Sequence, residues 1–173
     1  MMRAGYVRAW LSLGSNVERE QHIRAALDAL AGRFGELVIS PVYDSASVGF
    51  VGSPFLNLVV GIDTDMSVGA LSAWLRALED ANGRVRAQGR QYNDRTLDID
   101  ILTFGDVQGV VDGVALPRAE IVKHAFVLRP LADVAPDECH PAFGVSWREM
   151  LAARDFNLQA LKARSFAWHE REL

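Results

Sequence analysis

Two aspartates, Asp98 and Asp100, interrupt an otherwise apolar run at residues 97–102. Successive side chains on a β-strand point to opposite faces, so residues two apart project from the same side. The apolar neighbours then belong to the other face, which predicts that both carboxylates stand on a strand backed by core. Like charges this close on a sheet are destabilising unless a positive group lies between them. Because hard oxygen ligands suit magnesium, the pair is a candidate site for a divalent cation.

An arginine-rich segment directly precedes this strand. It contains Arg84, Arg86, Arg90 and Arg95, together with glycines and few apolar side chains. A guanidinium group forks onto phosphate oxygens and keeps its charge, so such a loop beside a metal suits a polyphosphate. The alternative is a solvated, salt-bridged surface, which is the usual role of an arginine run. The apolar setting of the two aspartates weighs against it, because carboxylates on a buried strand are costly unless paired or metal-bound.

The composition is that of one globular domain with an acidic balance. The chain has 173 residues, half of them hydrophobic, and a formal net charge of −4. Nucleic-acid-binding domains are typically basic, so the local arginine cluster favours a small anionic ligand. The single cysteine, Cys139, excludes a disulfide framework and a multi-thiolate zinc site, and it fits a reducing cytoplasm. No apolar run approaches the roughly 20 residues of a membrane span, and the N-terminus does not read as a signal peptide.

The elements that must position these groups follow the order strand, helix, strand, strand, helix, strand. Alternating apolar residues mark the strands, and apolar residues at helical spacing mark the helices. A capping-box pattern, Ser15 with Glu18, predicts where the first helix begins. The order βαββαβ is typical of an α+β ferredoxin-like fold, an antiparallel sheet with its helices on one face. These predicted elements cover residues 7–13, 17–33, 37–48, 54–63, 67–81 and 97–102.

The last third of the chain is less regular. Glycines predict a hairpin over residues 106–114, and an apolar run predicts a helix over residues 121–130 that ends at a proline. A short helix is expected over residues 147–154. The tail, residues 156–173, fits either strand or helix. We therefore predict a single domain with a C-terminal tail extension.

Isolated histidines and tryptophans are given structural roles. His22 is interpreted as a surface residue of the first helix, and His140 as polar surface in a loop. The tryptophans are too scattered to form a cofactor cage, so we expect them in the core or packed against the tail. They are Trp10, Trp74, Trp147 and Trp168.

Several short motifs occur in the order seen in one protein family. One of them, Arg95-Thr96-Leu97-Asp98-Ile99-Asp100-Ile101-Leu102, is highly specific. From about residue 6 to residue 155 the chain resembles the hydroxymethyl-dihydropterin pyrophosphokinases of the folate pathway. The other motifs, supportive in combination, are Leu11-Ser12-Leu13-Gly14-Ser15-Asn16, Phe55-Leu56-Asn57, Gly83-Arg84-Val85-Arg86 and Ala125-Phe126-Val127-Leu128-Arg129-Pro130-Leu131.

The resemblance implies that pyrophosphate passes from ATP to the hydroxymethyl group of a reduced pterin, with release of AMP. It also implies a ferredoxin-like core with helices packed around it, in agreement with the pattern of elements. Asp98 and Asp100 would hold two Mg²⁺ ions that bridge the phosphates of ATP. The implied catalytic residues are these two aspartates with Arg84 and Arg95. The implied ATP-binding positions are Glu79, Arg84, Arg86, Arg95, Ile101, Arg118 and His124.

A pterin needs a stacking surface and hydrogen-bonding groups for its polar edge. Phe55 and Phe126 match aromatic positions of the family's pterin site, although Phe126 taken alone is more typical of core. Asn57 can donate and accept, and a lone amide in an apolar strand must find partners. The implied pterin-binding positions are Ser45, Val48, Gly49, Phe55, Asn57, Tyr92 and Phe126.

The loops depart from the family pattern. Where the family commonly has Trp-Gly-Pro before Arg-Thr, this chain has a longer segment in which Tyr92 stands as the aromatic residue. Arg118 stands where the family commonly has a histidine, and His124 stands where it commonly has an arginine. The positive charge is therefore moved from one position to the other and not removed. The proline-rich pterin loop is replaced by residues 45–49, which contain no proline. The motifs therefore predict the reaction class and leave the kinetic constants open.

Two alternatives stay open. The unusual pterin loop allows the same Mg-ATP chemistry with a different pterin or another alcohol as the acceptor. A ferredoxin-like fold can also bind RNA through exposed sheet aromatics. The strands here lack an aromatic pair beside basic residues, and the chain is acidic. We expect a monomeric, cytoplasmic enzyme whose partners are ATP and a reduced pterin, with no nucleic acid and no membrane.

Overall fold

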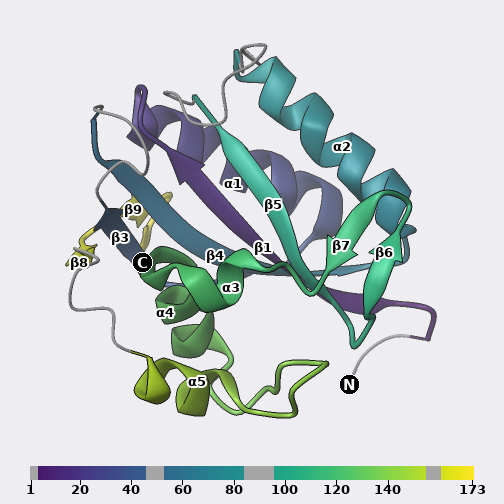
Figure 1. Ribbon diagram of the computed structural model, residues 1–173. Helices are drawn as coiled ribbons and strands as arrows, with labels where there is room; N and C mark the ends of the chain where they lie inside the picture. Colours follow the sequence, from purple (N-terminus) through teal and green to yellow (C-terminus); the bar gives the residue numbers. More distant parts are fainter. Residues whose placement is uncertain (1–3, 46–52, 84–95, 155–160) are drawn as a thin grey trace, which may run out of the picture.

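The computed structural model describes residues 4–45, 53–83, 96–154 and 161–173. Strands and helices alternate along the chain, and the described residues end in short strands (Figure 1). The elements are β1 Val7–Ser15, α1 Arg19–Phe34, β2 Val38–Ile39, β3 Val42–Ser45, β4 Phe55–Thr64, α2 Val68–Ala81, β5 Asp98–Phe104, β6 Gly109–Val111, β7 Val114–Leu116, α3 Glu120–Lys123, α4 Ala125–Val134, α5 Trp147–Ala153, β8 Leu161–Arg164, β9 Ala167–Trp168 and β10 Arg171–Glu172.

The main sheet is antiparallel and has the strand order β5-β1-β4-β3-β8, with β2 also paired to β4. Counting β2 and β3 as one interrupted strand gives the βαββαβ order of the ferredoxin-like fold, so that prediction is confirmed. β4 lies inside the sheet and is buried along almost its whole length. Its continuous apolar sequence fits a strand that is covered on both faces.

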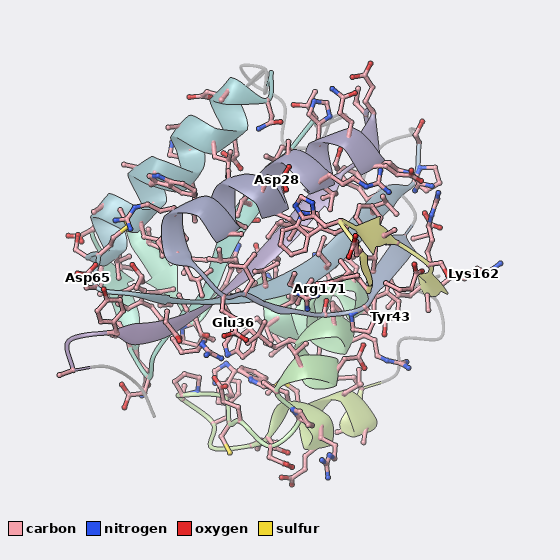
Figure 2. The ribbon with its side chains drawn as sticks, turned by 180° about the vertical axis from the view of Figure 1, so that it is seen from behind. Asp28, Glu36, Tyr43, Asp65, Lys162 and Arg171 are labelled. Carbon is pink, nitrogen blue, oxygen red and sulfur yellow. The ribbon has the colours of Figure 1, made fainter. Side chains whose placement is uncertain are left out.

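Helices cover both faces of the sheet. Helices α1 and α2 pack on the face of Leu11, Leu13 and the other odd-numbered residues of β1. Helices α3, α4 and α5 pack on the opposite face, against Trp10 of β1 and Leu102 of β5. Figure 2, viewed from behind, brings α1 and α2 in front of the sheet. The prediction of helices on one face therefore holds for α1 and α2 only, and a second layer completes the fold.

The predicted start of the first helix is wrong by two residues. Glu18, at the position before α1, has a left-handed backbone with φ of 44° and makes no side-chain cap. Ser15 donates its hydroxyl to the Val17 carbonyl and does not cap the helix. His22 is also buried, contrary to its assignment to the surface. Its ring Nδ1–H donates to the Val17 carbonyl at 2.8 Å, which folds the turn back onto the helix.

The predicted strand at residues 37–48 is divided into β2 and β3 between Ile39 and Val42. Ser40 explains the interruption, because its hydroxyl accepts the Val59 N–H at 2.8 Å in place of a backbone carbonyl. Pro41 follows and has no N–H to offer the sheet. The break leaves the short β3 free to pair with β8 on its other side.

The predicted helix over residues 121–130 is two helices. α3 ends before His124, which has an extended backbone (φ −125°, ψ 126°), and α4 begins immediately after it. α4 continues through Pro130 to Val134, so the expected stop at the proline is wrong. A proline removes one helical hydrogen bond, and burial of the apolar side of α4 outweighs that loss. Because the two helices are divided here, His124 and Phe126 lie at the N-terminus of α4.

His140 is buried and not a surface residue. Its Nδ1 accepts the backbone N–H groups of Ala142 and Phe143, and its ring stacks on the Phe143 ring with centroids 4.1 Å apart. The Trp147 ring meets it edge-on. The imidazole therefore organises a tight loop. The tryptophans take the core and tail-packing positions expected: Trp10, Trp147 and Trp168 are buried, and Trp74 packs against the core.

The described part of the tail forms strands. β8 extends the main sheet beside β3, and β9 pairs with β10. The predicted hairpin is present as β6 and β7, over residues 109–116 instead of 106–114, with Asp112 and Gly113 at its turn in left-handed conformations. Within the described ranges, no helix combines the length and apolar character needed to cross a membrane.

Candidate active site

The register of the three central strands brings the predicted site residues into rows. Gly14 of β1 pairs with Asn57 of β4 on one side and with Asp98 of β5 on the other. Directly paired residues of antiparallel strands place their side chains on the same face. Adjacent strands lie about 4.8 Å apart, so roughly 10 Å separates the Asn57 and Asp98 backbones. A second row, two residues along, joins Asp100 to Ser12 in the same way.

These rows face the layer of α3 and α4. Leu102 and Val59, which alternate in phase with Asp100 and Asn57, pack against α4 residues. The carboxylates and the amide therefore emerge where that apolar packing ends. The prediction that Asp98 and Asp100 share one face is confirmed, since Ile99 and Ile101 lie in the opposite core.

Gly14 leaves the middle of the row open. A Cβ atom there would lie 3.2 Å from the Asn57 Oδ1 atom and 3.6 Å from the Phe55 Cδ1 atom. The first distance is tighter than an ordinary van der Waals contact. A glycine at this point keeps clear the surface between the amide and the carboxylates. The motif that contains Gly14 was noted in the sequence, but only the sheet register assigns it this position.

Asp100 carries the strongest electrostatic perturbation of the site. Its withdrawal from solvent, followed by repulsion from Asp98, raises the pKa of the Asp100 carboxyl from 3.8 to about 7. Arg118 opposes this rise, with its Nη2 atom 3.4 Å from the Asp100 Oδ1 atom, whereas Glu79 and Glu120 add to it. Arg118 also contacts Glu120, Nε to Oε2, at 3.0 Å. The sequence analysis missed Glu120, although its position two residues after Arg118 was visible.

The donor set suits a hard cation. Two carboxylates face one way, and the charge on Asp100 is disfavoured until a positive group approaches. In the described part of the chain, no group of three or more His, Cys, Asp or Glu side chains could hold a metal ion. Mg²⁺ does not require such a group, because it is commonly bound by one or two carboxylates plus substrate phosphates. The pair therefore fits the ion that the resemblance implies.

Glu79 lies on the other side of β5. It is buried near the end of α2, and its Oε2 atom accepts the Ile99 backbone N–H at 2.8 Å. This contact fixes the edge of β5 next to the aspartates. Ile101, another predicted ATP contact, is buried in the core on the α2 side, which leaves a nucleotide only its backbone atoms.

His124 and Phe126 form an aromatic pair at the start of α4. Their rings are stacked, with centroids 4.8 Å apart and 14° between planes. Burial lowers the pKa of His124, and Glu120 opposes that shift, so the ring favours its neutral form. A neutral imidazole offers hydrogen bonds and a stacking face in place of the arginine charge common in the family. Phe126 packs only partly into the core, so it is not an ordinary core residue.

Asn57 and Ser45 supply the polar groups on the β4 side. Both are buried, and the Asn57 Nδ2 donates to the Ser45 Oγ atom. With the amide oriented in this way, its Oδ1 faces the open space above Gly14. Phe55, two residues before Asn57, is half-buried on the same face. The structure thus brings together Ser45, Phe55 and Asn57. The other predicted positions, Arg84, Arg86, Arg95, Val48, Gly49 and Tyr92, lie outside the described residues.

Comparison with known proteins supports this arrangement. The family model of 7,8-dihydro-6-hydroxymethylpterin-pyrophosphokinase matches residues 10–136, well over half of the chain. The chain belongs to this family. The pyrophosphokinase match includes both rows of the site and ends two residues after α4.

Curated relatives agree with the family match. A 2-amino-4-hydroxy-6-hydroxymethyldihydropteridine pyrophosphokinase of Pseudomonas aeruginosa is 40% identical over 154 residues, covering 86% of this chain and 93% of the relative. A protein of the same name from Methylorubrum extorquens is 34% identical over 152 residues, covering 86% and 94%. The folic acid synthesis protein fol1 of Schizosaccharomyces pombe is 32% identical over 137 residues, which are 77% of this chain but 18% of fol1.

Solved structures support the fold. The wild-type Plasmodium falciparum HPPK-DHPS with pterin and p-hydroxybenzoate aligns with a TM-score of 0.66 over 88% of this chain, at 14% identity. Another wild-type HPPK-DHPS structure from the same organism gives a TM-score of 0.62 over 85% of this chain, also at 14% identity. The chain spans less than half of those two longer chains, 42% and 44%. The similarity is one of fold, the ferredoxin-like fold of this chain.

Proposed function

We propose that this protein transfers pyrophosphate from ATP to the hydroxymethyl group of 6-hydroxymethyl-7,8-dihydropterin, releasing AMP in folate biosynthesis. The observation that carries the proposal is the row Asn57–Gly14–Asp98. It sets a buried amide, suited to a heterocycle edge, roughly 10 Å by strand spacing from a carboxylate pair suited to a metal nucleotide. Membership of the pyrophosphokinase family supplies the reaction that joins two such ligands.

In the proposed reaction the pterin hydroxyl oxygen bonds to the β-phosphorus of ATP. The bond from that phosphorus to the oxygen bridging the α-phosphorus breaks, AMP leaves, and the hydroxyl proton is released. Asn57 and Phe55 orient the pterin, and the clear surface over Gly14 lets the hydroxymethyl group face the nucleotide. Holding the two reactants in line supplies much of the rate gain in phosphoryl transfer.

Asp98 and Asp100 are the proposed ligands of two Mg²⁺ ions. Such ions neutralise the triphosphate and template its geometry when bound. Arg118 already lies beside Asp100 and is placed to shift from that carboxylate to a phosphate oxygen. Arg84, Arg86 and Arg95 remain predicted partners of the triphosphate, and Arg84 and Arg95 predicted catalytic residues.

An AMP-release assay tests the function. Purified protein with Mg²⁺, ATP and the reduced hydroxymethyl pterin should yield AMP and pterin diphosphate in equal amounts. ADP as the nucleotide product, or no turnover, would refute the proposal. A panel of other pterins and simple alcohols in the same assay tests the alternative acceptors that the altered loop at residues 45–49 allows.

Further expectations accompany this proposal. A single domain over residues 1–173, a monomeric state and a cytoplasmic location remain predictions. Some structurally similar proteins are longer HPPK-DHPS chains, so they give no direct information on the oligomeric state of this chain. Measuring the mass of the protein in solution tests the predicted monomer. The RNA-binding alternative is disfavoured, since Phe55 and Phe126 belong to the candidate site beside acidic residues and not to a basic sheet surface.

A further inference from the structure

The strand that carries Ser45 is held in place from a distant part of the chain. β8 pairs with β3, setting Leu161 opposite Ser45 and Ala163 opposite Tyr43. Without β8, the four-residue β3 would be an edge strand. The family match ends at residue 136, so β8 lies beyond it. In Figure 2, Lys162 of β8 and Tyr43 of β3 lie at the same edge of the molecule.

The tail is anchored independently of β3. Phe166 and Trp168 are buried in the core next to α1. The Trp168 Nε1 atom donates to Asp28 at 2.9 Å, and the Arg24 Nε atom donates to the Ala167 carbonyl at 2.8 Å. Because these contacts are to α1, they bring β8 to a fixed position from which it can position β3.

Asp44, between Tyr43 and Ser45, is the point where α1 and β8 meet. One carboxylate oxygen accepts a hydrogen bond from Arg19 at the start of α1. The other lies 3.7 Å from the Nη1 atom of Arg164 in β8. Arg164 also pairs with Glu20, the neighbour of Arg19, so two arginines and two carboxylates alternate in one cluster.

Residues around the start of α1 also hold the start of β4. Arg19 donates to the Pro54 carbonyl at 3.2 Å, and the Asn16 Nδ2 atom donates to the Ser53 carbonyl at 3.1 Å. Arg19 thus links the last residues of β3 to the residue just before Phe55. The ends of the two strands that carry Ser45, Phe55 and Asn57 are tied to one helix start.

We propose that Arg19, Asp44 and Arg164 form a clamp that positions the pterin side of the active site. This clamp acts through Ser45 and Phe55 and does not itself touch the reacting atoms, so its members are positioning residues. The inference rests on the proposed function, because it takes a pterin as the ligand of that side. It assigns the C-terminal strand β8 a part in substrate affinity.

A matched ion pair provides the control. Arg8 of β1 contacts Asp63 of β4, Nε to Oδ1, at 2.6 Å. The side chains of this pair are 33% and 41% exposed, and those of Arg19 and Asp44 are 25% and 29% exposed. It lies at the other end of β4, and Asp63 comes two residues before Asp65, which Figure 2 labels. Part-exposed ion pairs contribute little to folding, so breaking either should change stability by similar small amounts.

The experiment compares Asp44→Asn with Asp63→Asn. We expect Asp44→Asn to raise KM for the pterin about tenfold, with KM for ATP within about twofold of wild type and the melting temperatures of the two variants similar. Asp63→Asn should keep the wild-type pterin KM. Equal pterin KM values in both variants, in an enzyme with wild-type turnover, would overturn the clamp and leave the proposed function intact.

Arg164 tests the contribution of β8. Arg164→Ala should raise the pterin KM in the same direction as Asp44→Asn, and Arg164→Lys should restore part of the affinity because it keeps a positive charge beside Asp44. An unchanged pterin KM in Arg164→Ala would remove β8 from the clamp. Calorimetric titration of the pterin into each variant reports binding without turnover. If the wild type neither binds nor turns over the pterin, the proposed function fails, and this inference fails with it.

Discussion

The β3–β4 side and the β5 side of the candidate site differ in how their polar groups are neutralised. On the β3–β4 side, Asn57 bonds Ser45, and Asp44 lies between Arg19 and Arg164. On the β5 side, Asp100 is influenced by several carboxylates and by one described guanidinium, that of Arg118. The first side is formed before any ligand arrives. Among the described residues, the second side carries more carboxylates than cationic groups, which suits the binding of a divalent cation.

The largest expected effect comes from breaking the β5 side. Asp98→Ala or Asp100→Ala removes a proposed metal ligand, and we expect AMP release to fall by about three orders of magnitude, or roughly 4 kcal/mol of transition-state stabilisation. Single-turnover AMP formation measures this. Asp63→Ala, which removes a carboxylate at the far end of β4, is the control and should retain activity. Near-normal turnover in either site variant would refute the metal assignment.

A smaller effect is expected where the two sides meet. Gly14→Ala places a methyl group 3.2 Å from the Asn57 Oδ1 atom and into the space between the two ligands. We expect kcat/KM for the pterin to fall about tenfold, the equivalent of about 1.4 kcal/mol, while calorimetry shows retained ATP binding. Gly32→Ala, in α1 with nothing near the added methyl, is the control. Unchanged pterin kinetics in Gly14→Ala would show that the space is not used.

The pH dependence of stability sharpens the contrast in charge. The pKa of Asp100 is about 7 in the folded protein and 3.8 ordinarily, so between these pH values the folded state holds a proton that the unfolded state has released. The free energy of unfolding should therefore fall as pH rises from about 4 to about 7 and level off above. Thermal unfolding with a chelator present measures the slope.

Asp100→Asn should flatten that slope, because the amide does not titrate. Added Mg²⁺ should raise the melting temperature more at about pH 8 than at about pH 5, since the cation binds the charged carboxylate. The same slope in wild type and Asp100→Asn would assign the effect to other groups.

The smallest expected effect lies behind the β3–β4 side. Tyr43 of β3 donates its hydroxyl to Asp133 of α4, and burial, followed by Asp133, raises its pKa to about 12. Tyr43→Phe removes this link at a cost of about 1 kcal/mol, and in a protein of this size the melting temperature should fall by about 2–4 °C. In an Asp133→Ala background, which has no side-chain acceptor, the same substitution should cost less. Equal costs in both backgrounds would mean that the bond contributes nothing.

Local patterns predicted what depends on local geometry. The βαββαβ order follows from apolar periodicity, and the common face of Asp98 and Asp100 follows from the alternation of a strand. The start of α1 was missed because the left-handed Glu18 and the His22 contact to Val17 replace the capping box. His140 was missed because its partners are backbone N–H groups of its own loop, which no side-chain pattern reveals.

Long-range pairings lay beyond the sequence pattern. β8 lies more than a hundred residues after β3. A four-residue segment with mixed polarity does not indicate which strand it will pair with. The Asp44 cluster combines residues from α1, β3 and β8 and was not predicted for that reason. Gly14 belongs to the motif of residues 11–16. Its position between Asn57 and Asp98 can be known only from the register of three strands.

Glu79 has a consequence for the protein in solution. Among the described strands, β5 and β8 are the outermost of the sheet, and exposed edges invite strands from other molecules. At β5 the Glu79 carboxylate occupies the Ile99 N–H, so an incoming strand finds that donor already engaged. At β8 the exposed Lys162 sets a charge on the rim. We therefore expect the folded chain to resist edge-to-edge association at high concentration, because the Glu79 carboxylate of α2 hinders the addition of a strand at β5.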